Sequence, residues 1–97
     1  MRRAAKVDAN QAEVVKALRA AGCGVLDLSA VGKGCPDLLV HPPTYPECRM
    51  VVLMEVKNKK GRGDKLTPAQ VKFHEEWKGW IYRVTSVDEA LEAMGIK

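Results

Sequence analysis

The longest strand-like run in the chain reads MVVLMEVK and spans residues 50–57. Side chains alternate between the two faces of a strand, so every second residue of this run points the same way. Glu55 and Lys57 therefore share one face, at the end of an otherwise apolar segment. A carboxylate and an ammonium group at the end of a buried strand cost free energy unless they are paired or bind a ligand. We therefore expect a central strand whose polar end carries chemistry.

Three shorter runs also have the composition of strands, and helix signals separate them from one another. These runs span residues 24–29, 37–41 and 80–84. Capping boxes predict helices that start at Asp8, Thr67 and Ser86. Glycines at positions 22, 79 and 95 follow these helices and predict their ends.

The expected helices each carry apolar residues that we expect to be buried in a common core. These residues are Val14, Val15 and Leu18 in the first helix, Val71, Phe73 and Trp77 in the second, and Ala90, Leu91 and Met94 in the third. The resulting order is α-β-β-β-α-β-α, which is typical of an α/β fold with a small mixed sheet flanked by helices. The β-α-β unit within residues 50–84 predicts two parallel strands. A chain of 97 residues suits one domain, residues 1–97.

The positive charge of the chain is concentrated in one loop. The chain has 16 basic and 12 acidic residues, a net charge of +4, and residues 57–65 hold five of the basic residues and one acidic residue. This loop contains Lys59, Lys60, Arg62 and Lys65 beside two glycines. Lysine and arginine release counterions when they bind phosphates, so the loop suits contact with nucleic acid. A solvated, charged turn is the alternative.

The composition also excludes some classes of protein. The longest apolar run, residues 50–54, is too short to cross a bilayer. No apolar signal core follows the basic residues at positions 1–6. Cys23, Cys35 and Cys48 are odd in number and form no CxxC pair, which favours reduced thiols over a disulfide framework or a zinc site. We therefore expect a cytoplasmic protein without a membrane partner.

A second acidic residue precedes the polar end of residues 50–57. Asp37 opens the preceding strand-like run, directly after Pro36. If the two strands are neighbours, Asp37 and Glu55 converge; the alternative for Asp37 is a turn residue after proline. Two convergent carboxylates beside a lysine make an oxygen-donor site suited to Mg²⁺ or Mn²⁺. With Lys57 to position water or neutralise charge, such a site is typical of phosphodiester hydrolysis.

These residues resemble the signature of the PD-(D/E)xK nucleases, in which Pro36-Asp37 is followed by Glu55-Val56-Lys57. A wider set resembles the VRR-NUC (virus-type replication-repair nuclease) group of that superfamily. The set comprises GCPDLLV at 34–40, MEVK at 54–57, GR at 61–62, LTPAQ at 66–70 and His74. The resemblance covers nearly the whole chain, from the first helix to the strand at residues 82–84. It implies a restriction-endonuclease-like core.

The resemblance also implies roles for the central residues. Asp37 and Glu55 would be metal ligands, and the Val56 carbonyl would complete the site. Lys57 would be the catalytic lysine.

Four other residues are weaker candidates. Glu13 matches an acidic residue on the first helix that often joins the site in this family, although it also reads as a solvated helix residue. Gln70 matches a glutamine near the metal or the scissile phosphate, although its place in the capping box explains it equally well. Lys33, between two glycines, is a candidate phosphate contact, and His74 is a candidate DNA contact.

The predicted function is that of a Mg²⁺-dependent DNA endonuclease, with Mn²⁺ as a substitute. Small viral members of the group resemble archaeal Holliday-junction resolvases, so the resemblance implies a homodimer that cleaves branched DNA. One alternative is a nuclease that nicks DNA or processes flaps and ends outside junctions. Another is a non-catalytic DNA-binding module on the same fold. The presence of Asp37, Glu55 and Lys57 together favours an enzyme.

Overall fold

The described part of the chain forms helices and strands in the order expected from the sequence. A computed structural model describes residues 9–44, 50–58 and 65–97. The elements are α1 (Ala9–Ala20), β1 (Gly24–Asp27), β2 (Leu38–His41), β3 (Val52–Val56), α2 (Pro68–Glu76), β4 (Ile81–Val84) and α3 (Val87–Ala93). The predicted order α-β-β-β-α-β-α is confirmed, and so is the α/β class with a small mixed sheet.

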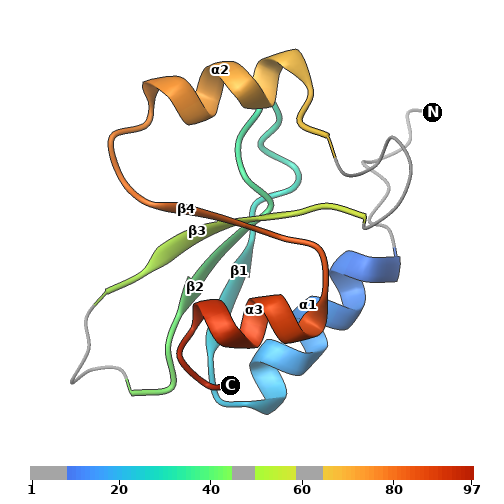
Figure 1. The fold of residues 1–97 in the computed structure, drawn as a ribbon, viewed down its shortest axis with the longest axis vertical. Helices are drawn as coiled ribbons and strands as arrows, with labels where there is room; N and C mark the ends of the chain where they lie inside the picture. Colours follow the sequence, from blue (N-terminus) through green and yellow to red (C-terminus); the bar gives the residue numbers. More distant parts are fainter. Residues whose placement is uncertain (1–8, 45–49, 59–64) are drawn as a thin grey trace.

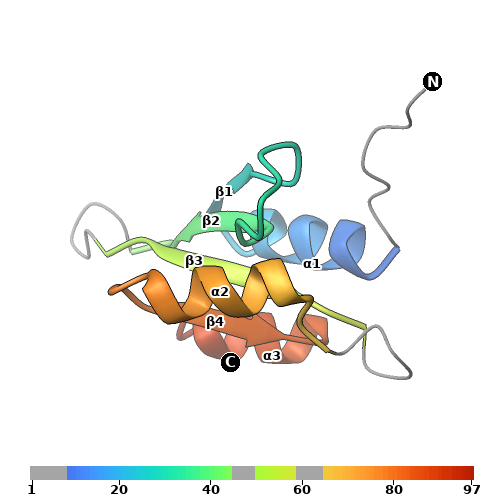
Figure 2. The same cartoon turned by 90° about the horizontal axis from the view of Figure 1, so that it is seen from above.

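The four strands form one sheet in the order β1-β2-β3-β4. The pairs β1–β2 and β2–β3 are antiparallel, whereas β3 and β4 are parallel, as the β-α-β unit predicted. Helix α2 lies on one side of the sheet, and α1 and α3 lie on the other (Figure 1). The view from above shows α2 in front of β3 and β4 rather than in front of β1 (Figure 2).

The main hydrophobic core lies between the sheet and the helices α1 and α3. Its buried residues are Val14, Leu18, Cys23, Leu38, Val40, Val52, Met54, Val56, Val84, Ala90 and Met94, with Val15 and Leu91 packed partly buried against them. Full burial of one such aliphatic side chain contributes about 1.5–3 kcal/mol, so this face of the sheet holds the fold together. The predicted apolar stripes of the first and third helices are confirmed.

The prediction that the second helix buries Val71 and Trp77 is wrong. Val71 is 41% exposed and Trp77 is 46% exposed, and α2 contains no buried residue. Phe73 is half-buried and stacks on Trp77, with their ring centroids 5.6 Å apart. The pattern of apolar residues in α2 predicts a helix. It does not show whether other parts of the fold bury these side chains. Polar contacts, described below, position α2.

Thr67 and Ser86 cap their helices as predicted, and the box at Thr67 is complete, whereas Glu89 Oε1 accepts from the Thr85 N–H, one residue before the cap of α3. Gln70 N–H donates to Thr67 Oγ1, and Thr67 N–H donates to Gln70 Oε1, which closes the predicted capping box. Ser86 caps α3, because its Oγ accepts a hydrogen bond from the Glu89 N–H. Asp8, the predicted cap of α1, lies outside the described residues.

The strands are shorter than the sequence predicted. Met50 and Val51 precede β3 and are 63% and 48% exposed. Trp80 precedes β4 and is 68% exposed. Asp37 directly precedes β2 instead of opening it. A strand ends where pairing with its neighbour ends. The length of an apolar run does not show where pairing stops.

The two described cysteines have free thiols, as expected. Cys23 is buried and Cys35 is half-buried, whereas Cys48 lies outside the described residues. Of the helices in the described ranges, none has the length and hydrophobicity needed to cross a bilayer.

Candidate active site

Strand pairing brings Asp37 and Glu55 together at one end of the sheet. Strands β2 and β3 pair with Leu38 opposite Met54, and extending this antiparallel register by one residue places Asp37 opposite Glu55. The two carboxyl groups interact, since Asp37 is one of the groups that raise the pKa of Glu55. Asp37 Oδ2 also accepts a 2.8 Å hydrogen bond from the Val56 N–H. The two acidic residues therefore converge, as expected if their strands were neighbours.

Glu55 is a carboxyl group in an almost dry environment, since its side chain is 1% exposed. Burial, followed by the hydrogen bond and the charge of Asp37, raises the pKa of Glu55 to about 8, although Lys57 and Arg83 act in the opposite direction. Without a bound cation, the carboxyl pair therefore retains a proton near neutral pH. A cation between these groups would favour their ionised forms, because it supplies the opposite charge that they lack.

The Gln70 amide joins Glu55 of β3 to Lys57, the residue directly after β3. Gln70 Nε2 donates a 3.0 Å hydrogen bond to Glu55 Oε2, and Lys57 Nζ donates a 3.1 Å hydrogen bond to Gln70 Oε1. The same Oε1 accepts the 2.8 Å bond from the Thr67 N–H that closes the capping box. Of the two interpretations of Gln70 that the sequence left open, the capping role is present, and the same side chain also lies in the site.

Helix α1 reaches this end of the sheet through Asn10. Asn10 Nδ2 donates to the main-chain carbonyl of Lys57 at 2.8 Å and to that of Thr85 at 3.2 Å. These two carbonyls follow β3 and β4, so Asn10 ties the parallel strands together beside the carboxyl pair. The sequence carries no signal for this contact, because Asn10 reads as an ordinary polar residue of a first helical turn.

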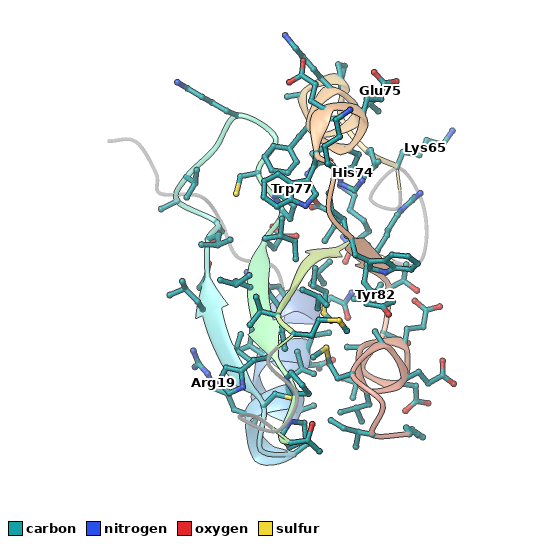
Figure 3. The ribbon with its side chains drawn as sticks, turned by 90° about the vertical axis from the view of Figure 1, so that its left-hand side faces the viewer. Arg19, Lys65, His74, Glu75, Trp77 and Tyr82 are labelled. Atoms are coloured by element: carbon teal, nitrogen blue, oxygen red, sulfur yellow. The ribbon has the colours of Figure 1, made fainter. Side chains whose placement is uncertain are left out.

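His74 faces the carboxyl pair from α2. Its Nε2 lies 3.7 Å from Glu55 Oε1, and neither of these buried atoms has a hydrogen-bond partner among the described residues. Burial, followed by the charge of Arg83, lowers the pKa of His74. Figure 3 shows His74 and Trp77 on the side of α2 that faces the sheet, whereas Glu75 lies on the outer side. The spacing from Gln70 to His74, one helical turn, was the available sequence signal.

Arg83 and Cys35 are further neighbours of the site. Arg83 lies opposite Glu55 in the parallel register of β3 and β4, and its side chain is exposed. Burial and then the charges of Glu55 and Asp37 raise the pKa of the Cys35 thiol. The position of Arg83 depends on strand pairing, which a single sequence does not specify, whereas Cys35 lies two residues before Asp37 in the chain.

Gly34 sets the distance between the loop before Asp37 and the first turn of α2. Its φ is +82°, and a Cβ atom at this position would lie 2.2 Å from the Ala69 carbonyl oxygen and 3.0 Å from the Gln70 nitrogen. Real Cβ atoms do not approach backbone so closely, so any side chain here would push α2 away. Glycine at position 34 therefore keeps Gln70 within reach of Glu55 and Lys57.

The structure places the other predicted site residues differently. Glu13 is exposed on α1, and within the described ranges no group of three or more His, Cys, Asp or Glu side chains is arranged to hold a metal ion. The assignment of Glu13 as a ligand stays a prediction. Lys33 is exposed in the turn before Asp37, with a φ of +58°. Lys65 is exposed close to the first turn of α2 (Figure 3).

Three predicted DNA contacts, Lys59, Lys60 and Arg62, lie outside the described residues.

Comparisons of the chain with protein-family models, with curated proteins and with solved structures find no match. The function of the site is therefore inferred from its own residues and their arrangement.

Proposed function

We propose that this chain is a divalent-metal-dependent DNA endonuclease with a restriction-endonuclease-like core. The observation that carries the proposal is the convergence of the half-buried Asp37 with the buried Glu55, next to Lys57, which directly follows β3. A carboxyl group buried this deeply is costly in a purely structural role. Strongly shifted carboxyl groups beside a lysine are instead typical of sites that bind a cation or catalyse a reaction.

The donor atoms of the site fit Mg²⁺ or Mn²⁺. Asp37 and Glu55 would hold the ion, and the main-chain carbonyl of Val56 would complete the protein ligands, because hard divalent cations prefer oxygen. The buried Glu55 Oε1, which has no hydrogen-bond partner among the described residues, is an acceptor that such an ion would satisfy. When bound, the ion supplies Lewis-acid chemistry to the phosphate and to water.

Lys57 supplies a positive charge next to the carboxyl pair. Its ammonium group is held by Gln70 Oε1 at 3.1 Å, so its position is fixed before substrate binds. From there Lys57 orients the attacking water or stabilises the negative charge that develops on the phosphate. The water oxygen forms a new bond to phosphorus, and the bond from phosphorus to the leaving sugar oxygen breaks in line with it. Gln70 acts as a positioning residue for Lys57.

Basic residues around the site would hold the DNA backbone. Lys33 is exposed in the turn before Asp37, and Lys65 is exposed shortly before α2. Lys59, Lys60 and Arg62 belong to the same basic stretch of sequence as Lys65. Lysine and arginine contacts to phosphates carry no base information. The proposal therefore predicts binding that weakens steeply with salt and depends little on base sequence.

We further propose that the active form is a homodimer that cleaves branched DNA, as the family resemblance implies. The exposed apolar side chains of Met50, Val51 and Trp80 support a subunit contact. Met50, Val51, Val52, Trp80 and Tyr82 line a hollow of about 440 Å³ where β3 and β4 begin. Exposed apolar surface of this kind often marks a protein contact.

The test compares a labelled four-way DNA junction with the matched linear duplex, in Mg²⁺, Mn²⁺ and EDTA. Wild type is compared with Lys57→Ala and with Lys97→Ala, a lysine at the far C-terminus that forms a solvent-exposed ion pair with Asp88. The oligomeric state is measured in the same buffers by light scattering.

We expect a dimer that makes metal-dependent paired cuts in the junction. Lys57→Ala loses the cuts but retains DNA binding, and Lys97→Ala resembles wild type. Equal cutting of junction and duplex would support the nuclease activity but contradict the preference for branched DNA. Binding without cutting in either metal would instead identify a non-catalytic DNA-binding module.

A further inference from the structure

Helix α2 covers the carboxyl pair without belonging to the hydrophobic core. None of its residues is buried. Its described links to β3 are polar, and they include the bond from Gln70 to Glu55. Gly34 lets the preceding loop touch its first turn. A helix held in this way is loosely attached, because few buried apolar contacts oppose its release.

Two polar atoms that face each other between α2 and the sheet lack hydrogen-bond partners among the described residues. Glu55 Oε1 and His74 Nε2 are both buried and both lack a hydrogen-bond partner among the described residues. They face each other at 3.7 Å, which is too long for a hydrogen bond. A buried polar group without a partner destabilises the folded protein. A ligand placed between these two atoms would satisfy both.

A divalent cation has the size and charge to satisfy both atoms. Two ligands of one small divalent ion lie roughly 3–3.6 Å apart, given metal–ligand distances near 2.0–2.2 Å. The observed 3.7 Å needs only a small approach of α2 to the sheet. A neutral imidazole coordinates metals through a ring nitrogen.

We propose that His74 Nε2 is a ligand of the site's divalent cation, so that the ion bridges Glu55 on β3 and His74 on α2. This proposal rests on the proposed function, because it uses the same cation. The described residues hold no ready-made group of three such side chains. That finding fits an ion that draws α2 toward the sheet better than one that enters a closed cage.

The bridge has two consequences. Imidazole nitrogen suits Mn²⁺ and later transition metals better than Mg²⁺, which prefers oxygen. The site should therefore bind Mn²⁺ more tightly than Mg²⁺, and the preference should depend on His74. Binding of the ion should also fasten α2 to β3, so that the amides of residues 69–76 exchange with solvent more slowly.

The test uses Mn²⁺ as its own spectroscopic probe. Electron spin echo measurements on wild-type protein with bound Mn²⁺ detect a coordinated nitrogen directly, without relying on a variant. Calorimetry gives the affinities of Mn²⁺ and Mg²⁺ for wild type, His74→Ala, Glu55→Gln and the control Glu75→Ala, which changes the outer side of α2 (Figure 3). Hydrogen exchange of α2 is followed with and without Mn²⁺.

We expect nitrogen coupling in wild type that is lost in His74→Ala. We also expect Mn²⁺ binding to weaken about tenfold or more in that variant, a loss typical of disturbing a metal site, while Mg²⁺ binding changes far less. Mn²⁺ should slow exchange in α2 of wild type and Glu75→Ala but not of His74→Ala. Mn²⁺ that binds through Glu55 with no nitrogen coupling would overturn the bridge and leave the nuclease proposal intact. If Glu55→Gln did not weaken Mn²⁺ binding, this result would contradict both the bridge and the nuclease proposal.

Discussion

The amide of Gln70 donates a 3.0 Å hydrogen bond to the buried carboxyl group of Glu55 and so connects helix α2 to the central strand. The same side chain accepts hydrogen bonds from Lys57 and from the cap residue Thr67. One residue therefore both starts the helix and positions the charged groups of the site.

The variant Gln70→Glu separates these two roles. Glutamate at N3 still accepts the cap hydrogen bond, but it replaces the donor to Glu55 with a second negative charge. We expect the helix content in circular dichroism to be retained and single-turnover cleavage to fall by about 10²-fold, since misplacing a catalytic group has an effect of this size. Cleavage at the wild-type rate would show that Gln70 acts only as a helix cap.

The raised pKa of Glu55 predicts a pH-dependent stability of the metal-free protein. Folding raises the pKa of this carboxyl group from 4.5 to about 8, so between these values the folded state binds more protons than the unfolded state. The free energy of unfolding should therefore decrease as pH rises through this window, by up to about 1.4 kcal/mol per pH unit.

Urea unfolding in EDTA at pH 5, 6, 7 and 8 measures this slope. Glu55→Gln should flatten it, because the amide does not titrate, whereas the exposed control Glu75→Gln should retain it. A wild-type protein whose stability rises from pH 5 to pH 8 would contradict the assigned burial of Glu55.

Gly34→Ala should both destabilise the protein and reduce cleavage. The substitution places a Cβ atom 2.2 Å from the Ala69 carbonyl oxygen at a φ of +82°. Gly32→Ala is the matched control, because its φ is +75° and a Cβ atom there meets nothing within 4 Å. The left-handed conformation alone costs roughly 1–2 kcal/mol, so Gly32→Ala should lose about that much in urea unfolding. Gly34→Ala should lose clearly more, and equal losses would show that the contact with α2 is unimportant.

Asn10→Ala tests the connection between α1 and the ends of β3 and β4. It removes two hydrogen bonds to the carbonyls of Lys57 and Thr85, and leaving these acceptors without a partner costs about 1–3 kcal/mol. We expect a lower midpoint of urea unfolding and slower cleavage, because the backbone of Lys57 loses its support. Asn58→Ala changes an exposed asparagine of the same segment and should have little effect on either measurement.

The elements of the fold were predictable because their signals are local. The capping box at Thr67, the cap at Ser86 and the stripe of Val14 and Leu18 depend on residues a few positions apart, and each appears in the structure. The environment of α2 was not predictable. Trp77 has the spacing of a core residue but is 46% exposed, because a helical pattern does not specify what lies opposite it.

The central residues of the site were predictable from their spacing, whereas their surroundings were not. Glu55 and Lys57 share a strand face by alternation alone. Arg83 and Asn10 reach the same place only through the register of β4 and the path of α1. Such pairings join residues far apart in the chain, and one sequence does not specify them. The proposed ligand role of Glu13 stays a prediction that metal titration of Glu13→Gln would test.

The most direct test of the account is plasmid cleavage by wild type and Glu55→Gln in Mg²⁺, Mn²⁺ and EDTA, with DNA binding measured in Ca²⁺. Glu55→Gln keeps the shape of the side chain and removes the charge that would bind the ion. The account predicts metal-dependent cleavage by wild type, loss of at least about 10²-fold in the variant, and unchanged DNA binding. Cleavage by Glu55→Gln at the wild-type rate, or the absence of cleavage by wild type in every metal, would contradict it.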